Sequence, residues 1–201
     1  MALLFAKNNS LSAVTALPAS ISGGGLNLIS TQTASSSSTI DFTSGIDSTY
    51  KEYIFKFINI HPSADGSQFL FNLSADTGSN YNVTKTTTAF RSFHSEDDSA
   101  TGLGYYTGGD LAQSTDFQRF ADSLGNDNDQ SLSGTFTLFN PSSTTFVKHF
   151  IANVNYSYDA DYSLQYFLAG YGNTTSAVDA IQFKMNSGNI DSGTIKLYGV
   201  S

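Results

Sequence analysis

The strongest constraint on the fold is an alternation of apolar and polar residues near the end of the chain. Ile181, Phe183 and Met185 alternate with polar neighbours, and Ile195 and Leu197 do the same a few residues later. A period of two is that of a β-strand with one buried face. The segment between the two runs is rich in Asn, Ser, Gly and Asp, which adopt turn conformations readily. We therefore predict a closing β-hairpin with Ile195 and Leu197 buried.

Glycines within and after this turn have a geometric role in the prediction. We expect Gly188 and Gly193 to supply backbone conformations that other residues adopt at a cost. A final strand paired inside a sheet would also make the end of the chain part of the core.

The same alternation recurs upstream and predicts an all-β fold. In 52–61 both faces are apolar, with Ile54, Ile58 and Ile60 on one of them, which predicts a strand that is central or covered by another subunit. Residues 110–125 fit either a short helix or an irregular crossing strand. The other predicted strands are 26–33, 69–75, 81–93, 134–139, 145–156 and 162–170.

Two strands of this set carry specific burial predictions. Along 69–75, the alternation predicts that Ala75 is buried together with the apolar residues that precede it in phase. Along 145–156, Phe146 and Phe150 share the predicted buried face, and His149 lies on the other.

These spacings predict an antiparallel β-sandwich, jelly-roll-like, with an extended N-terminal arm. About eight to ten strands separated by turns favour this architecture over a βαβ fold. The loose composition of Ser20–Leu26 and the run Ser35–Ser38 set a boundary. We divide the chain into an N-terminal docking arm at 1–37 and a β-sandwich domain at 38–201.

Composition excludes several functions. Charged residues make up 13% of the chain and the net charge is −8, so no basic cluster is available to neutralise nucleic-acid phosphates. Cysteine is absent, which excludes disulfides and thiolate metal sites. No apolar run reaches the length of a membrane span. At 11–20 a signal core is the alternative to an arm, but no basic region precedes it.

A resemblance rests on phrases that occur in a fixed order. They are DFTSGIDSTY (41–50), YIFKFINIHP (53–62), GSNYN (78–82), FNPSS (139–143) and the ending SGNIDSGTIKLYGV (187–200). In this set the chain resembles an uncharacterised virion protein family of tailed marine bacteriophages. The resemblance implies a structural component of the virion, associated with the tail or fibre or decorating the capsid. It supplies no catalytic residues.

The spacing of the histidines and acidic residues along the sequence gives little support for a metal site or a catalytic site. The three histidines, His61, His94 and His149, have no short ligand spacing. Asp127 and Asp129 form the best candidate Ca²⁺ site, because neighbouring Gly and Asn could add carbonyl ligands; solvated loop acids are the competing interpretation. We expect no catalytic residues, no cofactor and no enzymatic activity.

Tyrosines are the best candidate binding residues. A tyrosine ring supplies rigid contact area with a polar tip, which suits interfaces and glycan recognition; lining of the sheets is the alternative. The candidates for interface or binding residues are Tyr105, Tyr106, Tyr158 and Tyr162.

Three functions follow from these observations. The first is a structural virion protein that docks through its arm to other virion proteins and assembles as a homo-oligomer, a homotrimer. The second is a receptor- or carbohydrate-binding module at a fibre tip that contacts a host-surface glycan. The third, a depolymerase, has no recognisable site.

Overall fold

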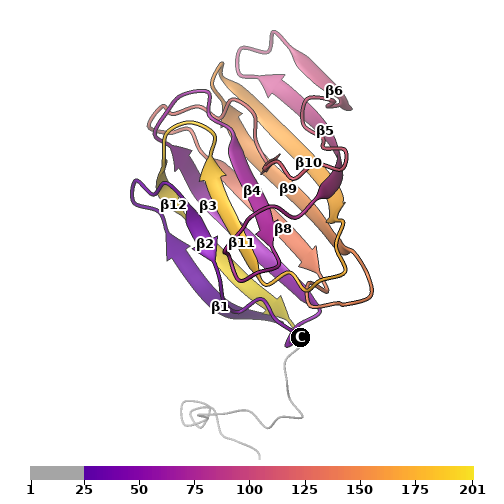
Figure 1. Cartoon of the computed structure of the whole chain (residues 1–201). Helices are drawn as coiled ribbons and strands as arrows, with labels where there is room; N and C mark the ends of the chain where they lie inside the picture. Colours follow the sequence, from indigo (N-terminus) through magenta and orange to yellow (C-terminus); the bar gives the residue numbers. More distant parts are fainter. Residues whose placement is uncertain (1–24) are drawn as a thin grey trace, which may run out of the picture.

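Residues 25–201 form a sandwich of two antiparallel β-sheets in the computed structural model (Figure 1). The large sheet has eight strands in the order β1-β12-β3-β8-β9-β10-β5-β6, and the small sheet has four in the order β2-β11-β4-β7. No helix occurs in this range. The strands are β1 Leu26–Thr33, β2 Ile40–Phe42, β3 Glu52–Pro62, β4 Phe69–Ser74, β5 Lys85–Ser95, β6 Thr101–Tyr105, β7 Gln118–Arg119, β8 Leu132–Phe139, β9 Lys148–Tyr158, β10 Tyr162–Gly172, β11 Ala180–Met185 and β12 Ile190–Val200.

The strand order is that of a jelly roll with a widened sheet. From β1 to β4, successive strands lie alternately in the large and the small sheet. The strands β7, β8, β11 and β12 alternate in the same way, and the hairpin β9–β10 is an insertion in the large sheet between β8 and β11. The result is the order β1-β12-β3-β8 facing the order β2-β11-β4-β7, in which the first and last strands are neighbours. This confirms the predicted all-β sandwich of jelly-roll type.

Four strands extend the large sheet beyond this jelly-roll core. The hairpin β9–β10 pairs with β8, and β5–β6 then pairs with β10. Figure 1 shows β5 and β6 reaching past the small sheet. The segment between β6 and β8 crosses from one sheet to the other, so 110–125 is an irregular crossing segment that includes only the short strand β7.

Phenylalanine rings fill the space between the sheets. Phe57 of the large sheet lies 5.3 Å from Phe69 and 5.4 Å from Phe183 of the small sheet, measured between ring centroids. Phe71 stacks on Phe120 at 4.6 Å. Such pairs bury large apolar areas and add a geometric preference of about 0.5–1.5 kcal/mol each.

The closing segment folds into the predicted strands but not into a hairpin. β11 lies in the small sheet between β2 and β4, whereas β12 lies in the large sheet between β1 and β3. The turn between them crosses the sandwich instead of reversing within one sheet. Ile195 and Leu197 are fully buried, as predicted. Gly188 and Gly193 have φ values of 69° and 119°, which confirms their role in backbone geometry.

Two predictions of shared faces were wrong for local reasons: Ile60 does not share the face of Ile58, and Phe146 is not buried with Phe150. Ile60 is fully buried, whereas Ile58 remains 41% exposed. A bulge at Asn59, with a φ of 50°, shifts the register and turns Ile60 to the inner face. Phe146 is 67% exposed because it precedes the first residue of β9, whose alternation buries Phe150.

A third prediction fails at the end of β4. The strand ends at Ser74, and Ala75, which we expected to be buried, is exposed in the turn that follows. Residues Phe69, Phe71 and Leu73 are fully buried, as the alternation predicted.

The strand predicted at 26–33 lies in the sandwich itself. It is β1, the edge strand of the large sheet, and it pairs with β12 from Leu26↔Val200 to Thr33↔Thr194. Residues 34–37 continue this contact, because Ser37 and Ile190 exchange backbone hydrogen bonds of 2.8 Å. The remainder of the predicted docking arm, 1–24, lies outside the described residues.

Candidate functional site

The face of the large sheet that points away from the small sheet, here the outer face, carries most of the exposed apolar side chains. Direct pairing places Tyr105, Phe90 and Phe167 in one row across three strands. Ile151 pairs with Ala169 in the next row. Apart from Phe146, the strongly exposed large hydrophobic residues all point from this face; they are Leu26, Leu28, Ile58, Phe90, Leu103, Tyr105 and Ile151.

Acidic residues are absent from the widened part of this face. The strands β5, β6, β8, β9 and β10 contain no Asp or Glu, although the chain has 17 of them. The charged side chains Lys85, Arg91 and Lys148 lie in the same alternation phase as buried neighbours and point inward. An uncharged apolar surface of this kind is typical of a contact surface.

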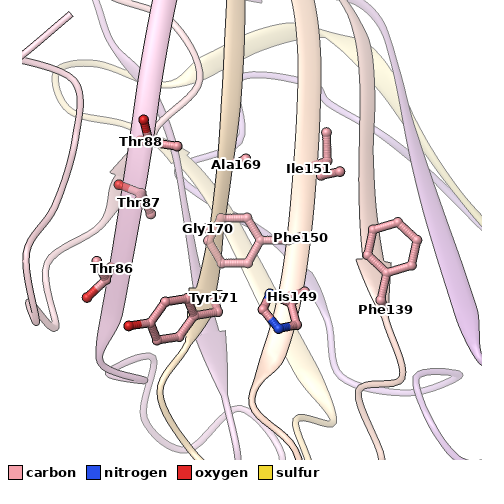
Figure 2. A pocket seen from close by; sticks show the side chains of 10 residues that line it. All are labelled: Thr86, Thr87, Thr88, Phe139, His149, Phe150, Ile151, Ala169, Gly170 and Tyr171. Atoms are coloured by element: carbon pink, nitrogen blue, oxygen red, sulfur yellow. The ribbon is translucent and has the colours of Figure 1, made fainter.

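A shallow hollow of about 550 Å³ lies on the outer face (Figure 2). At one end the rings of His149 and Tyr171 meet edge to face, with centroids 5.9 Å apart. Thr88 and Ile151 flank the small side chain of Ala169 at the other end. Beyond it, Phe90 stacks on Phe167 at 4.6 Å. We call Phe90, Ile151, Phe167 and Tyr171 the outer patch.

A second surface lies on the inner side of the sheet, near the ends of β5, β9 and β10, where the small sheet no longer covers it. A pocket of about 160 Å³, here the aromatic pocket, is formed there. Phe93 and Tyr158 each contact the ring of Tyr162 edge to face, at 5.8 and 5.7 Å. The five residues that line the pocket are Arg91, Phe93, Tyr158, Tyr162 and Leu164.

A charge network supports one wall of the aromatic pocket. The two arginines of the chain, Arg91 and Arg119, converge on Asp122. Arg119 donates a hydrogen bond of 3.2 Å to Oδ1, and the hydroxyl of Tyr106 donates to Oδ2. Burial, followed by the hydrogen bond to Asp122, raises the pKa of Tyr106 above its usual value. The carboxylate of Asp122 is therefore well partnered without Arg91.

Arg91 is positioned but retains unused donors. Its guanidinium lies 3.9 Å from the centre of the Tyr106 ring, a cation–π contact. The nearest oxygen of Asp122 is 3.7 Å away, too far for a hydrogen bond. The side chain is 28% exposed, so its donors are accessible from the pocket.

The structure separates the four predicted tyrosines. Tyr158 and Tyr162 line the aromatic pocket, and Tyr106 supports it from behind through Arg91. Tyr105 points to the outer face, where it is 58% exposed and donates a hydrogen bond to Asp110. The adjacent residues Tyr105 and Tyr106 thus serve opposite faces, as alternation along a strand requires.

The acidic candidates do not converge. Among the described residues, no group of three or more His, Asp or Glu side chains could hold a metal ion. In the Asp127–Asp129 turn, the side-chain oxygen of Gln130 accepts a hydrogen bond of 3.1 Å from the Asp127 amide. Gln130 thus closes the turn from inside.

The histidines lie in separate places. His61 contacts the carbonyl of Gln130 at 2.8 Å, and His94 lies 3.2 Å from Asp98. His149 lies on the outer face. Residues 25–201 also contain no helix long and apolar enough to cross a bilayer.

Sequence reasoning missed Arg91. The residue lies in a threonine-rich stretch whose alternation is hard to read, so its inward direction was not evident. The signal that could have identified it was the scarcity of arginine. The chain has only two arginines in 201 residues and few charged residues, so each arginine is a candidate for a specific role.

Comparison with known proteins assigns no family. No protein-family model matches the chain, and no curated protein is similar to it in sequence.

Proposed function

We propose that this chain is a non-enzymatic structural subunit of a tailed-bacteriophage particle that assembles by burying the outer face of its large sheet. The observation that carries the proposal is the composition of that face: exposed Phe90, Leu103 and Ile151 on strands without a single carboxylate. In a chain with a net charge of −8, such a face is where neighbouring molecules meet with the least charge repulsion.

The energetics favour burial of this face. Phe90 is 45% exposed and Ile151 is 54% exposed. Complete burial of a large apolar side chain contributes about 1.5–3 kcal/mol, so burial of the exposed half contributes roughly half of that for each residue. The neighbouring threonines and asparagines keep hydrogen-bonding capacity for a partner, and the nearby carboxylate of Asp110 already accepts a hydrogen bond from the hydroxyl of Tyr105.

The resemblance to phage virion proteins supports the assignment of this chain to a phage particle. The fold supports a structural role in that particle. Jelly rolls occur widely in capsid and lectin domains. In this proposal the chain resides in the virion, in the tail, a fibre or the capsid surface, and forms a homotrimer through the outer patch. Residues 1–24 dock it to other virion proteins.

The first experiment measures the molar mass of the purified chain by size-exclusion chromatography with light scattering. The wild type is expected to elute as an oligomer, and Ile151→Asp is expected to yield a monomer because a charge enters the contact. Phe146→Asp is the matched control, since Phe146 is exposed but lies off the outer face. Equal oligomers for both variants would contradict the role of the outer patch.

The second experiment tests the virion itself. Phage carrying tagged wild-type, Ile151→Asp or Phe146→Asp chains are purified and probed for the tag. Incorporation of the wild type and of Phe146→Asp, with loss of Ile151→Asp, is the expected result. Particles that lack the wild-type chain would overturn the assignment to the virion.

A further inference from the structure

The geometry points to the aromatic pocket as a binding site for a neutral pyranose, a single sugar unit of a larger glycan. This activity is separate from assembly through the outer face, because the pocket opens on the inner side of the sheet. The pocket combines the two elements that sugar recognition requires, which are aromatic surface for the C–H faces of the ring and polar groups for its hydroxyls.

The apolar elements form the floor and walls. Leu164 is 3% exposed and lies at the base of the pocket. Phe93, Tyr158 and Tyr162 surround it, and the two edge-to-face contacts of Tyr162 hold the three rings at fixed angles. Rings that are already ordered lose little conformational entropy when a ligand binds.

The polar groups of the pocket have no hydrogen-bond partner within residues 25–201. Within residues 25–201, the guanidinium of Arg91 donates no hydrogen bond at all. The hydroxyls of Tyr158 and Tyr162 also have no hydrogen-bond partner in that range. Three residues that carry these groups, one from each of three strands, thus line one hollow of about 160 Å³. Pairs of sugar hydroxyls match donors arranged in this way.

The charges around the pocket favour a neutral sugar over an acidic one. Arg91 shares the single carboxylate of Asp122 with Arg119, so its charge is offset only in part. Glu96, Asp97 and Asp161 line a hollow on the other side of Tyr162, so a sugar carboxylate would approach several negative charges. A neutral pyranose avoids that repulsion and still accepts hydrogen bonds from Arg91.

The experiment uses saturation-transfer NMR on the full chain. The probes are the methyl glycosides of glucose, galactose and mannose, with glucuronate as the acidic comparison. A ligand of about a dozen non-hydrogen atoms is expected to bind with a Kd of about 1 mM. At least one neutral glycoside should receive saturation, and glucuronate should receive less. No transfer to any neutral glycoside at about 20 mM, far above this Kd, would overturn the proposal.

Variants locate the binding. The double variant Tyr158→Phe/Tyr162→Phe keeps all ring contacts and removes only the hydroxyls, so the fold is preserved while the Kd is expected to rise about tenfold or more. Arg91→Gln is expected to weaken binding similarly. Tyr171→Phe, on the outer face, should bind as the wild type does. Unchanged affinity in the double variant and in Arg91→Gln would place the sugar elsewhere, and tighter binding of glucuronate would refute the neutral class.

Discussion

Lys85 and Lys148 point into the sandwich from the two strands that flank β10, and both lie opposite the same residue, Gly172. Each lysine is fully buried. Neither forms a salt bridge within the described residues. The core beneath the widened sheet therefore contains two ammonium groups whose hydrogen bonds all go to neutral oxygens, and the charge of Asp116 adds a longer-range attraction to Lys85. Such groups are costly to bury, because desolvation opposes the charged form.

The surroundings of Lys85 show how the cost is limited. Its Nζ donates hydrogen bonds to Asn72 Oδ1 at 2.5 Å and to the carbonyl of Val83 at 2.8 Å. Asn72 in turn donates to the carbonyls of Tyr81 and Thr115, which fixes the amide. Burial still lowers the pKa of Lys85 from 10.5 to about 8.

The first prediction is that the chain becomes more stable as pH rises from 7.5 to 9.5. The folded state binds the Lys85 proton more weakly than the unfolded chain does, so unfolding takes up protons between the folded pKa of about 8 and the unfolded value of 10.5. The free energy of unfolding should therefore rise by about 2 kcal/mol from Lys85 over this interval. Urea denaturation at the two pH values measures it.

Lys85→Met tests the assignment of this rise. The variant should lose about 2 kcal/mol of the pH-dependent gain, because the titrating group is gone. Lys148 contributes in the same direction, since burial lowers its pKa as well, so part of the rise should remain. Lys184→Met, on the small sheet, is the control and should keep the full rise. An identical pH profile for Lys85→Met and the wild type would contradict the prediction.

The sequence predicted which side of a strand is buried better than it predicted which strands pair. Alternation identified the strand that contains Ile195 and Leu197 and the side on which they are buried, because a period of two depends only on the chain itself. Pairing depends on the rest of the molecule. A short polar turn can close a hairpin or cross between sheets, and the turn after Met185 crosses. The single-residue bulge at Asn59 had no sequence signal that alternation could detect.

The candidate site was only half predictable. Tyr158 and Tyr162 were identified from residue type, because tyrosine suits binding wherever it is accessible. Their convergence with Arg91 depends on the two antiparallel ladders that join β5, β10 and β9, and on the loop that brings Asp122 beneath the sheet. The outer face was likewise foreseen only at the strand of residues 52–61, since a patch across several strands is visible only when their register is known.

The second prediction concerns Gly193, whose φ of 119° disfavours any other residue. A Cβ there would lie 2.6 Å from the backbone oxygen of Asn59 and 2.8 Å from Cα of Ile60. Gly193→Ala should therefore lower the free energy of unfolding by about 1–3 kcal/mol or more. Gly104→Ala is the matched control, because nothing lies within 4 Å of its Cβ position. Thermal melts that do not distinguish the two variants would refute the expectation.

The third prediction distinguishes two N-terminal truncations. Removal of residues 1–24 leaves every described strand in place, so its melting temperature should match that of the full chain. Removal of 1–37 also deletes β1 and the hydrogen bonds of Ala34, Ser36 and Ser37 to the start of β12. An exposed β12 edge and a lost strand should lower the melting temperature by at least about 5 °C. Circular dichroism measures both, and equal melting temperatures would show that β1 is dispensable.

The fourth prediction concerns Asp122, which links both arginines to the loop beneath the sheet. Asp122→Asn keeps the size of the side chain but removes the charge that pairs with Arg119 and accepts from Tyr106. Charge-assisted hydrogen bonds contribute about 1.5–3 kcal/mol each, so a loss of roughly 2 kcal/mol and a melting temperature about 4–8 °C lower are expected. Asp127→Asn, in an exposed turn, should melt within about 1 °C of the wild type. If both variants melt alike, Arg91 and Arg119 are held by their aromatic and backbone surroundings and not by this carboxylate.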